Sequence, residues 1–357
     1  MNDRLKTNDV VGILGGGQLG RMLSVAASRL GLRTHVFDPT ASPPAADVAH
    51  RLTTASYKDE KALTTFAKSV NVVTYEFENI PTTALNILEQ HAQIRPSKEA
   101  LSISQDRLAE KLYLNNLGLK TAPFIAIEQL NDLQEGISEL GTPSILKTRR
   151  FGYDGKGQIM LSENSNLKDT FQKLASRQAI LEGFVTFSKE ISVIGARSAS
   201  GEISCFDPGE NIHKNGILYT TTVPAKLTVS QCTDAILITG QLMNALEYVG
   251  VIGVEIFVTD TGLVVNEIAP RVHNSGHWTQ NGCAIDQFEQ HIRAVAGWPL
   301  GEGNRHSNVR MENLIGSDIE KVERLKPGEN IAVHLYGKRA IKPGRKMGHI
   351  NHISSRN

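Results

Sequence analysis

Two glutamates in one short stretch of the chain, Glu255 and Glu267, have the spacing to hold a cation together. They fall in two apolar, β-branched runs, residues 254–258 and 263–268, joined by turn-forming residues, which is the pattern of a β-hairpin. If Thr261 is near the centre of the turn, the two side chains face each other with Cβ atoms about 4.5–5.5 Å apart. Carboxylates this close repel each other unless a cation separates them, and Mg²⁺ typically takes one or two protein carboxylates and completes its shell with water and phosphate. The hairpin therefore predicts a Mg²⁺ site; the alternative is an exposed hairpin with two solvated glutamates.

Cations and a glycine-rich loop precede this hairpin. Arg107 on an expected helix and Lys147 at the end of an expected strand carry charges suited to the α- and β-phosphates of a nucleotide. Residues 149–158 form a basic loop with three glycines within six residues, and ordering such a loop costs conformational entropy. A mobile lid over a triphosphate accounts for that cost better than a simple connector does. The lid residues expected to contact ATP are Gly152, Tyr153, Asp154, Gly155, Lys156, Gly157 and Gln158.

A strand that runs into a hinge, residues 180–185, follows the loop. Backbone groups of a hinge could read the edge of an adenine, and Glu190 is spaced to reach the ribose hydroxyls. His213 could also reach the nucleotide, although an ordinary loop histidine is nearly as good an interpretation. The remaining residues expected at the nucleotide are Glu182, Gly183, Phe184, Val185, Glu190, His213, Asn266 and Glu267.

A second glycine-rich turn, residues 15–20, follows a strand near the start of the chain and opens a helix. It fits G-x-G-x-x-G, and Asp38 ends the next strand eighteen positions after Gly20, about where a ribose-binding acid would lie in a dinucleotide fold. Alone, this motif predicts an NAD-dependent oxidoreductase. The glycines, however, only let the backbone approach an anion at a helix N-terminus, so any phosphorylated metabolite would satisfy them. The oxidoreductase interpretation also leaves the glutamate hairpin and the basic loop without a purpose.

Composition sets wider limits on the kind of protein. The chain has 357 residues, of which 40% are hydrophobic and 21% charged, as in soluble proteins of two or three domains. Its net charge of +1 argues against nucleic acid or a membrane surface as a partner. The three cysteines have no paired spacing, which favours a reducing compartment. We also find no apolar run of about 20 residues and no signal core, so we expect a cytoplasmic protein.

The elements that must position these residues change in kind along the chain. Residues 1 to about 95 alternate strands and helices, which predicts a small parallel sheet of the α/β class. A helix is expected from residue 104 or 106 to about 117. Beyond it, short strands around residues 124–127, 144–147 and 178–182 flank the basic loop, and a larger mixed α+β region follows.

The order of these features along the chain resembles that of the ATP-grasp superfamily: phosphate-binding cations, then the lid, the hinge and the metal hairpin. The stretch Glu-Ile-Ala-Pro-Arg-Val-His-Asn-Ser-Gly-His at residues 267–277 narrows the resemblance, together with residues 15–20, 75–79, 153–158 and 342–349. These motifs are similar to those of 5-(carboxyamino)imidazole ribonucleotide synthases, over essentially the whole chain. One departure is Ala269, which stands where many ATP-grasp enzymes have a metal-binding asparagine.

The resemblance implies an ATP-grasp fold with an N-terminal Rossmann-like (pre-ATP-grasp) domain at residues 1–97 and an ATP-grasp domain at residues 98–298. The lid subdomain would lie at about 120–185, and a small C-terminal domain at residues 299–357 would complete the substrate site. It also implies a homodimer through the N-terminal and central domains.

The activity implied is the ATP-dependent carboxylation of 5-aminoimidazole ribonucleotide by bicarbonate through carboxyphosphate, a step of purine biosynthesis that uses ATP and Mg²⁺. No covalent enzyme intermediate is needed, in agreement with the lack of a Ser-His-Asp or Cys-His signature. Arg271 is the candidate for holding bicarbonate, because a planar guanidinium matches a carboxylate. His273 could assist it, and Asp154 is a candidate contact or base for the substrate amine.

The resemblance also implies a site for the ribonucleotide's 5′-phosphate. The cationic residues expected to grip it are Lys338, Arg345 and Lys346, and the residues expected to line the same pocket are Gln18, Leu19 and Glu76. Two alternatives stay open besides the oxidoreductase: a nucleotide-binding regulatory protein without turnover, and a formate-using or glycinamide-using ATP-grasp enzyme.

Overall fold

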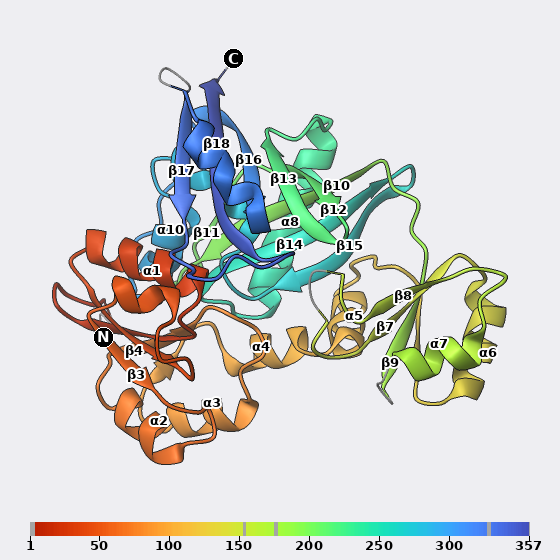
Figure 1. Ribbon diagram of the computed structural model, residues 1–357, viewed down its shortest axis with the longest axis horizontal. Helices are drawn as coiled ribbons and strands as arrows, with labels where there is room; N and C mark the ends of the chain where they lie inside the picture. Colours follow the sequence, from red (N-terminus) through yellow and green to blue (C-terminus); the bar gives the residue numbers. More distant parts are fainter. Residues whose placement is uncertain (1–3, 153–154, 175–177, 327–329, 357) are drawn as a thin grey trace.

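The computed structural model describes residues 4–152, 155–174, 178–326 and 330–356, which form three β-sheets with helices packed around them (Figure 1). The N-terminal sheet lies beside a large sheet that includes the C-terminal strands. The third sheet lies apart from the N-terminal one, at the other end of the molecule (Figure 1). The predicted combination of an α/β unit with α+β units is therefore what the chain forms.

The N-terminal sheet is parallel and has the strand order β3-β2-β1-β4-β5. Its strands are β1 (Val10–Leu14), β2 (Arg33–Asp38), β3 (Arg51–Thr54), β4 (Val72–Tyr75) and β5 (Gln93–Ile94). Its helices are α1 (Gln18–Arg29), η1 (Pro44–Asp47), α2 (Glu60–Ala67) and α3 (Thr82–Leu88). The predicted alternation is thus confirmed here. Because β1 is central, the glycine turn after it opens at the carboxyl edge of the sheet, where parallel sheets bind ligands.

Two short helices, α4 (Lys98–Ser104) and α5 (Arg107–Asn116), lead out of this unit. The predicted helix after residue 104 is α5, and Asp106 is its N-cap because its carboxylate accepts from the amides of Leu108 and Ala109. Ser104, the other expected start of this helix, instead ends α4. The cap places Arg107 at the first position of α5.

The third sheet is antiparallel, with the order β6-β9-β7-β8. Its elements are β6 (Phe124–Ile127), α6 (Leu130–Leu140), β7 (Ser144–Thr148), β8 (Gln158–Leu161), α7 (Leu167–Lys173) and β9 (Ala179–Gly183). Leu146 and Leu181 are fully buried in its small apolar core. Lys147 points to the opposite face of the pleated strand from Leu146, so the core of this sheet fixes the direction of the lysine.

The large sheet has nine strands in the order β15-β14-β10-β12-β13-β16-β18-β17, with β11 paired to β10. Its strands are β10 (Lys189–Arg197), β11 (Ile203–Cys205), β12 (Gly209–Lys214), β13 (Ile217–Val223), β14 (Gly250–Thr259), β15 (Gly262–Ala269), β16 (Ser307–Ile315), β17 (Ile331–Leu335) and β18 (Lys346–Ser355). The helices of this part are α8 (Val229–Ala245), η2 (Asn274–Gly276), α9 (Thr279–Gly282), α10 (Gln287–Val295) and η3 (Gly316–Arg324). Strands β16 to β18 continue the sheet begun by β10, so this sheet crosses the domain boundary predicted at residue 298. The division into domains stays a prediction.

One buried apolar cluster joins the N-terminal unit to the large sheet. Leu23 and Ala27 of α1 belong to the same cluster as Phe288 and Ile292 of α10 and Met311 of β16. This packing holds the glycine turn at the start of α1 against the segment that follows β15. No helix in the described part of the chain is long and apolar enough to span a bilayer.

Candidate active site

A cleft of about 560 Å³ is lined by strand residues of the third sheet and the large sheet, and by residues that follow β1 and β4 of the N-terminal sheet. The predicted site residues that line it are Gln18, Leu19, Glu76, Arg107, Lys147, Gly152, Gly155, Gln158, Glu190, His213, Glu255, Asn266, Glu267, Arg271, His273 and Lys346. Tyr153 and Asp154 lie outside the described residues. The predicted residues not among the cleft lining are Lys156, Gly157, Glu182, Gly183, Phe184, Val185, Lys338 and Arg345. Most of the side chains selected from the sequence are therefore brought to one place.

The glutamate hairpin has the predicted pairing, with Glu255 on β14 directly opposite Glu267 on β15. Its turn, however, is tighter than expected, because Thr259 pairs with Gly262. Continued without interruption, that register would place Asn266 opposite Glu255. A bulge at this point makes Asn266 the extra residue of β15 and restores the opposition of the two glutamates.

The two carboxylates differ in their surroundings. Burial and the negative charge of Glu267 raise the pKa of Glu255 above its ordinary value. Burial acts on Glu267 in the same direction, but Arg107 and Lys147 outweigh it and hold the pKa of Glu267 below its ordinary value. The Arg107 guanidinium lies 3.1 Å from the Glu267 carboxylate. The pair thus has the repulsion that a bound cation would relieve.

The donor set fits Mg²⁺ if phosphate completes it. Both hairpin ligands are hard carboxylate oxygens that line the cleft. Within the described residues, no group of three or more acidic, histidine or cysteine side chains could hold a metal by itself. A Mg²⁺ ion bound here would therefore be shared between the two glutamates, water and a nucleotide.

Buried ion pairs support the nucleotide side of the cleft. The Lys147 ammonium lies 2.8 Å from the Glu182 carboxylate, and the ammonium of Lys111 lies 3.5 Å from the same oxygen. Burial opposes the ionisation of Glu182, but the two lysines together hold its pKa below the ordinary value. Lys111 is only 2% exposed and also donates to the backbone carbonyl of Asn266. Lys111 therefore links β9, which carries Glu182, to β15, which carries Asn266. This role was not predicted from the sequence.

Glu190 and His213 form a second pair, 2.6 Å apart, on the neighbouring strands β10 and β12. Burial alone would lower the pKa of His213, but the Glu190 carboxylate and the charges of Glu255 and Glu267 raise it above the ordinary value. Sequence reasoning selected both residues without pairing them. A two-strand register would have been needed to see that they meet.

Arg271 and His273 follow β15 and both line the cleft. The Arg271 guanidinium lies 2.6 Å from the carboxylate of Glu78, which stands in the segment after β4. Burial and the charge of Arg271 lower the pKa of His273 well below its ordinary value. Glu76 was predicted from the sequence and Glu78 was not, although both acids lie in the same motif at residues 75–79. The missed residue is the one that contacts Arg271.

Asn274, next in the chain, was also missed. Both atoms of its side-chain amide are buried without a hydrogen-bond partner in the described part of the chain, and the residue lines the cleft. Buried amides are almost always hydrogen-bonded in folded proteins, so an unpaired one at a cleft indicates a place for a ligand or ordered water. Its position inside the 267–277 motif was the only signal in the sequence.

The N-terminal glycine turn is filled by carboxylates of the protein itself. The Glu76 carboxylate accepts from the amides of Gly17 at 2.8 Å and Gly20 at 3.0 Å, and Asp38 accepts from Gly16 at 2.7 Å. Burial raises the pKa of Glu76, while the hydrogen bonds from the Gly17 and Gly20 amides oppose that shift. Asp38 is thus used to hold the turn, and the Glu76 carboxylate competes with the pyrophosphate of a dinucleotide for the same amides.

The tail residues do not all reach the cleft. Lys346 lines it, and its charge acts on Glu255 and His273. Lys338 donates to the side chain of Gln18, at the start of α1, and to the Lys346 carbonyl at 2.7 Å. Arg345 instead donates to the carbonyl of Ala340 in its own loop. Of the three predicted cations, Lys346 lines the cleft and Lys338 contacts a cleft residue, Gln18, whereas the hydrogen bond of Arg345 stays within its own loop.

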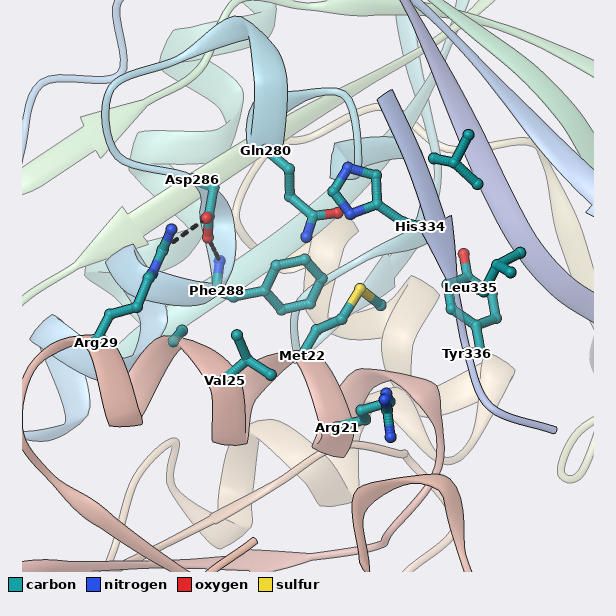
Figure 2. A pocket seen from close by; sticks show the side chains of 12 residues that line it. Arg21, Met22, Val25, Arg29, Gln280, Asp286, Phe288, His334, Leu335 and Tyr336 are labelled. Carbon is teal, nitrogen blue, oxygen red and sulfur yellow. Dashed lines mark hydrogen bonds and ion pairs between the residues drawn. The ribbon is translucent and has the colours of Figure 1, made fainter. Parts of the chain in front are cut away.

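A second hollow, of about 270 Å³, lies between α1, the start of α10 and β17 (Figure 2). Arg29 pairs with Asp286 at 2.8 Å on one side of it, and His334 and Tyr336 stand on the β17 side (Figure 2). None of the described residues predicted for nucleotide, metal or substrate lines this hollow.

Comparison with protein families assigns nearly the whole chain. The model of a ribonucleotide synthetase preATP-grasp domain matches residues 8–105, and that of an ATP-grasp domain matches residues 112–288. The phosphoribosylaminoimidazole carboxylase C-terminal domain matches residues 310–357. The N5-carboxyaminoimidazole ribonucleotide synthase of Brucella melitensis is 50% identical over 355 residues, which are 99% of this chain and 98% of that protein. The chain belongs to the N5-carboxyaminoimidazole ribonucleotide synthase family.

Solved structures agree with this assignment. An ADP complex of an N5-carboxyaminoimidazole ribonucleotide synthetase matches with a TM-score of 0.95 and 43% identity, over 99% of this chain and 94% of that one. The synthase from Aspergillus clavatus in complex with ADP and 5-aminoimidazole ribonucleotide matches with a TM-score of 0.92 and 30% identity, over 98% and 94% of the two chains. The ATP-grasp fold and the family predicted from sequence are confirmed. The oxidoreductase alternative is not supported by the relatives or by the filled glycine turn.

Proposed function

We propose that this chain carboxylates 5-aminoimidazole ribonucleotide with bicarbonate and ATP, giving N5-carboxyaminoimidazole ribonucleotide, ADP and phosphate in purine biosynthesis. The observation that carries the proposal is the meeting of Arg271 and His273 with the opposed Glu255 and Glu267 at one cleft. This arrangement offers an oxyanion-binding guanidinium beside a phosphate-and-metal site, which is what the phosphorylation of bicarbonate requires.

On the nucleotide side, Arg107 and Lys147 would neutralise phosphate charge. Mg²⁺, held by Glu255 and Glu267, would supply further charge neutralisation at the β- and γ-phosphates. The glycine-rich loop between β7 and β8 would cover the phosphates, and the end of β9 would contact the adenine. Glu190 would bind the ribose hydroxyls, supported by its contact with His213.

On the bicarbonate side, Arg271 would hold the anion while the phosphoryl group is transferred to it. Glu78 would hold the guanidinium in place through its 2.6 Å contact. Lys346 adds positive charge near Glu255 and His273, and the unpaired amide of Asn274 offers both a donor and an acceptor. Bicarbonate has both kinds of group, so this amide could pair with its hydroxyl as well as with its carboxylate.

The 5′-phosphate of the ribonucleotide would lie at the start of α1. The Glu76 carboxylate already accepts from the amides of Gly17 and Gly20. The phosphate would therefore bind at the amides of Gln18 and Leu19, which as part of the first helical turn have no intrahelical partner. Gln18 and Leu19 begin the helix at the cleft, and the Lys338 ammonium contacts the Gln18 side chain. A substrate bound this way extends toward Arg271, where its exocyclic amine would meet carboxyphosphate or the CO₂ released from it.

We further propose that the protein is cytoplasmic and a homodimer through its N-terminal and central domains. The unpaired state of all three cysteines agrees with a reducing compartment. Sedimentation equilibrium measures the assembly directly; a monomer at micromolar concentration would contradict the second statement.

The test of the function is a turnover assay with the purified chain. ADP and phosphate should form only when ATP, bicarbonate and 5-aminoimidazole ribonucleotide are all present, and ¹³C-bicarbonate should give a ¹³C NMR signal of an N-carboxylated product. ADP formation that ignores the ribonucleotide, or that needs formate or glycinamide ribonucleotide instead, would overturn the proposal.

Lys338→Ala tests the phosphate site. Loss of one charge-assisted hydrogen bond, worth about 1.5–3 kcal/mol, should raise the KM for the ribonucleotide about ten- to a hundredfold and leave the KM for ATP unchanged. Arg345→Ala is the matched control, because that guanidinium donates into its own loop. Equal effects of the two changes on the ribonucleotide KM would place the phosphate elsewhere.

A further inference from the structure

A chain of buried polar side chains runs from His273 into the large sheet. The His273 Nδ1 atom lies 2.8 Å from the Ser275 hydroxyl, which lies 2.7 Å from the hydroxyl of Ser192 on β10. The Asn211 side chain on β12 donates to Ser192 at 3.0 Å, and Thr221 on β13 donates to Asn211 at 2.8 Å. The four partners behind His273 are at most 5% exposed. Solvent therefore does not compete for these hydrogen bonds.

The donor directions in this chain follow from one another. Thr221 donates to the Asn211 carbonyl oxygen, so the amide nitrogen of Asn211 faces Ser192 and donates to it. Ser192 then donates to Ser275. The Ser275 hydroxyl has its proton left for the remaining neighbour, which is Nδ1 of His273.

A second donor, whose direction is fixed by covalent structure, points to the same nitrogen. The backbone amide of Ser275 donates a long, weak hydrogen bond to Nδ1 of His273, at 3.4 Å, which adds to the 2.8 Å contact of the Ser275 hydroxyl. A backbone amide cannot exchange its donor and acceptor atoms as an asparagine or a hydroxyl can. Two donors at Nδ1 require a lone pair there, so a neutral imidazole carries its proton on Nε2.

The ring is also held in position from two other sides. The side-chain amide of Gln287, which is fully buried, accepts from the His273 amide at 2.9 Å and donates to the His273 carbonyl at 2.8 Å. The ring packs on the bare backbone of Gly253, where a Cβ would lie 2.8 Å from the Cβ of His273. The imidazole therefore has a fixed orientation as well as a fixed proton.

We propose that Ser275, Ser192, Asn211 and Thr221 are positioning residues that lock His273 as the Nε2–H tautomer, so that it donates a hydrogen bond to bicarbonate or carboxyphosphate and is not a general base. The nearest carboxylate oxygen among the described residues, on Glu255, lies 3.5 Å from Nε2, which is too far for a good hydrogen bond. The N–H is thus left for an oxyanion in the cleft. This inference rests on the proposed function for the identity of that anion.

Long-range ¹H–¹⁵N NMR of the full-length chain reads the tautomer directly. In the wild type, Nδ1 of His273 should show the shift of an unprotonated ring nitrogen and Nε2 that of a protonated one; loss of the signals in His273→Gln assigns them among the 11 histidines. Protonation at Nδ1, or averaged shifts of the two nitrogens, would overturn the inference.

Ser275→Ala supplies the kinetic half of the test. It should lower kcat/KM for bicarbonate about three- to tenfold, the equivalent of one neutral hydrogen bond, and leave the KM for ATP unchanged. Ser192→Ala should act in the same direction and replaces it if Ser275→Ala does not fold. Unchanged bicarbonate kinetics in the folded variant would overturn the proposal.

Thr74→Val is the matched control. The Thr74 hydroxyl lies 2.7 Å from Nε2 of another buried histidine, His291, whose Nδ1 accepts from the Val251 amide. This variant should change the His291 signals and lower stability without changing bicarbonate kinetics. If the wild type shows no bicarbonate-dependent ADP formation, the proposed function fails, while the tautomer measurement still decides the assignment for His273.

Discussion

At the scale of single residues, the charges of the cleft are arranged as unequal pairs. The Glu267 carboxylate lies 3.1 Å from the Arg107 guanidinium. The basic side chain paired with Glu255 is His273, at 3.5 Å, whose lowered pKa favours the neutral ring. Burial and the negative charge of Glu267 raise the pKa of Glu255. The protonated form of the Glu255 carboxyl group is therefore favoured, and it must lose its proton when a cation binds. Cation binding at this hairpin is expected to release a proton, and the release should shrink as the pH rises.

Glu267→Gln removes one of the two facing charges. We expect Mg²⁺-dependent turnover to fall by at least about a hundredfold, since a bound metal contributes several kcal/mol of charge stabilisation in phosphoryl transfer. The free energy of unfolding without metal should change by less than about 1 kcal/mol, because relief of repulsion offsets the lost contact with Arg107. Steady-state kinetics over a range of Mg²⁺ and urea denaturation measure the two effects.

Glu210→Gln is the control for that variant. It breaks a Lys189–Glu210 ion pair of 2.9 Å on the same sheet, outside the cleft lining. Wild-type activity of Glu267→Gln at limiting Mg²⁺ would refute the metal assignment, as would equal losses in the two variants.

At the scale of elements, local patterns were sufficient where local rules decide the outcome. Apolar, β-branched runs predicted β14 and β15, and the strand-turn-helix pattern predicted β1 and α1. The bulge at Asn266 was not predictable, because it depends on how two registers meet across the hairpin. The same holds for Glu78, Lys111 and Ser275: each acts through a partner on a distant element, which the spacing of residues along the chain does not encode.

The glycine-rich loop between β7 and β8 gives a prediction at this scale. Gly155 has a φ of 75°, whereas proline is restricted to about −65°, so Gly155→Pro cannot keep the backbone geometry. We expect a higher KM for ATP together with a lower kcat, about tenfold in kcat/KM, because a covering loop must adopt a defined closed form. Gly201→Pro, at a φ of 90° in the turn between β10 and β11, is the matched control. Unchanged kinetics of Gly155→Pro would mean that the loop is only a connector.

At the scale of the whole molecule, three imidazoles connect the C-terminal strands to the segment that carries Arg271 and His273. His349 of β18 stacks on His334 of β17 at 4.5 Å and on His277 at 4.7 Å between ring centroids. The Gln287 amide that holds His273 also contacts Nδ1 of His277, at 3.0 Å. At its other end the stack reaches His334, which stands beside the second hollow (Figure 2). The packing of β17 and β18 on the segment that carries Arg271 and His273 therefore involves neutral rings, two of which, His277 and His349, are fully buried.

This dependence predicts the response of stability to pH. Burial lowers the pKa of His349 and His277 well below the ordinary value, so the unfolded chain binds protons first as the pH falls through about 6.5. Below about pH 6.5, each such histidine lowers the free energy of unfolding by at most about 1.4 kcal/mol per pH unit. Above that pH it has no such effect. His349→Gln should therefore lower the slope of the unfolding free energy against pH, between pH 6 and 4.5, by about 1.4 kcal/mol per unit, whatever its effect on stability at pH 8. Urea denaturation at a series of pH values measures both slopes, and equal slopes for His349→Gln and the wild type would show that the stack takes up its protons without loosening the fold.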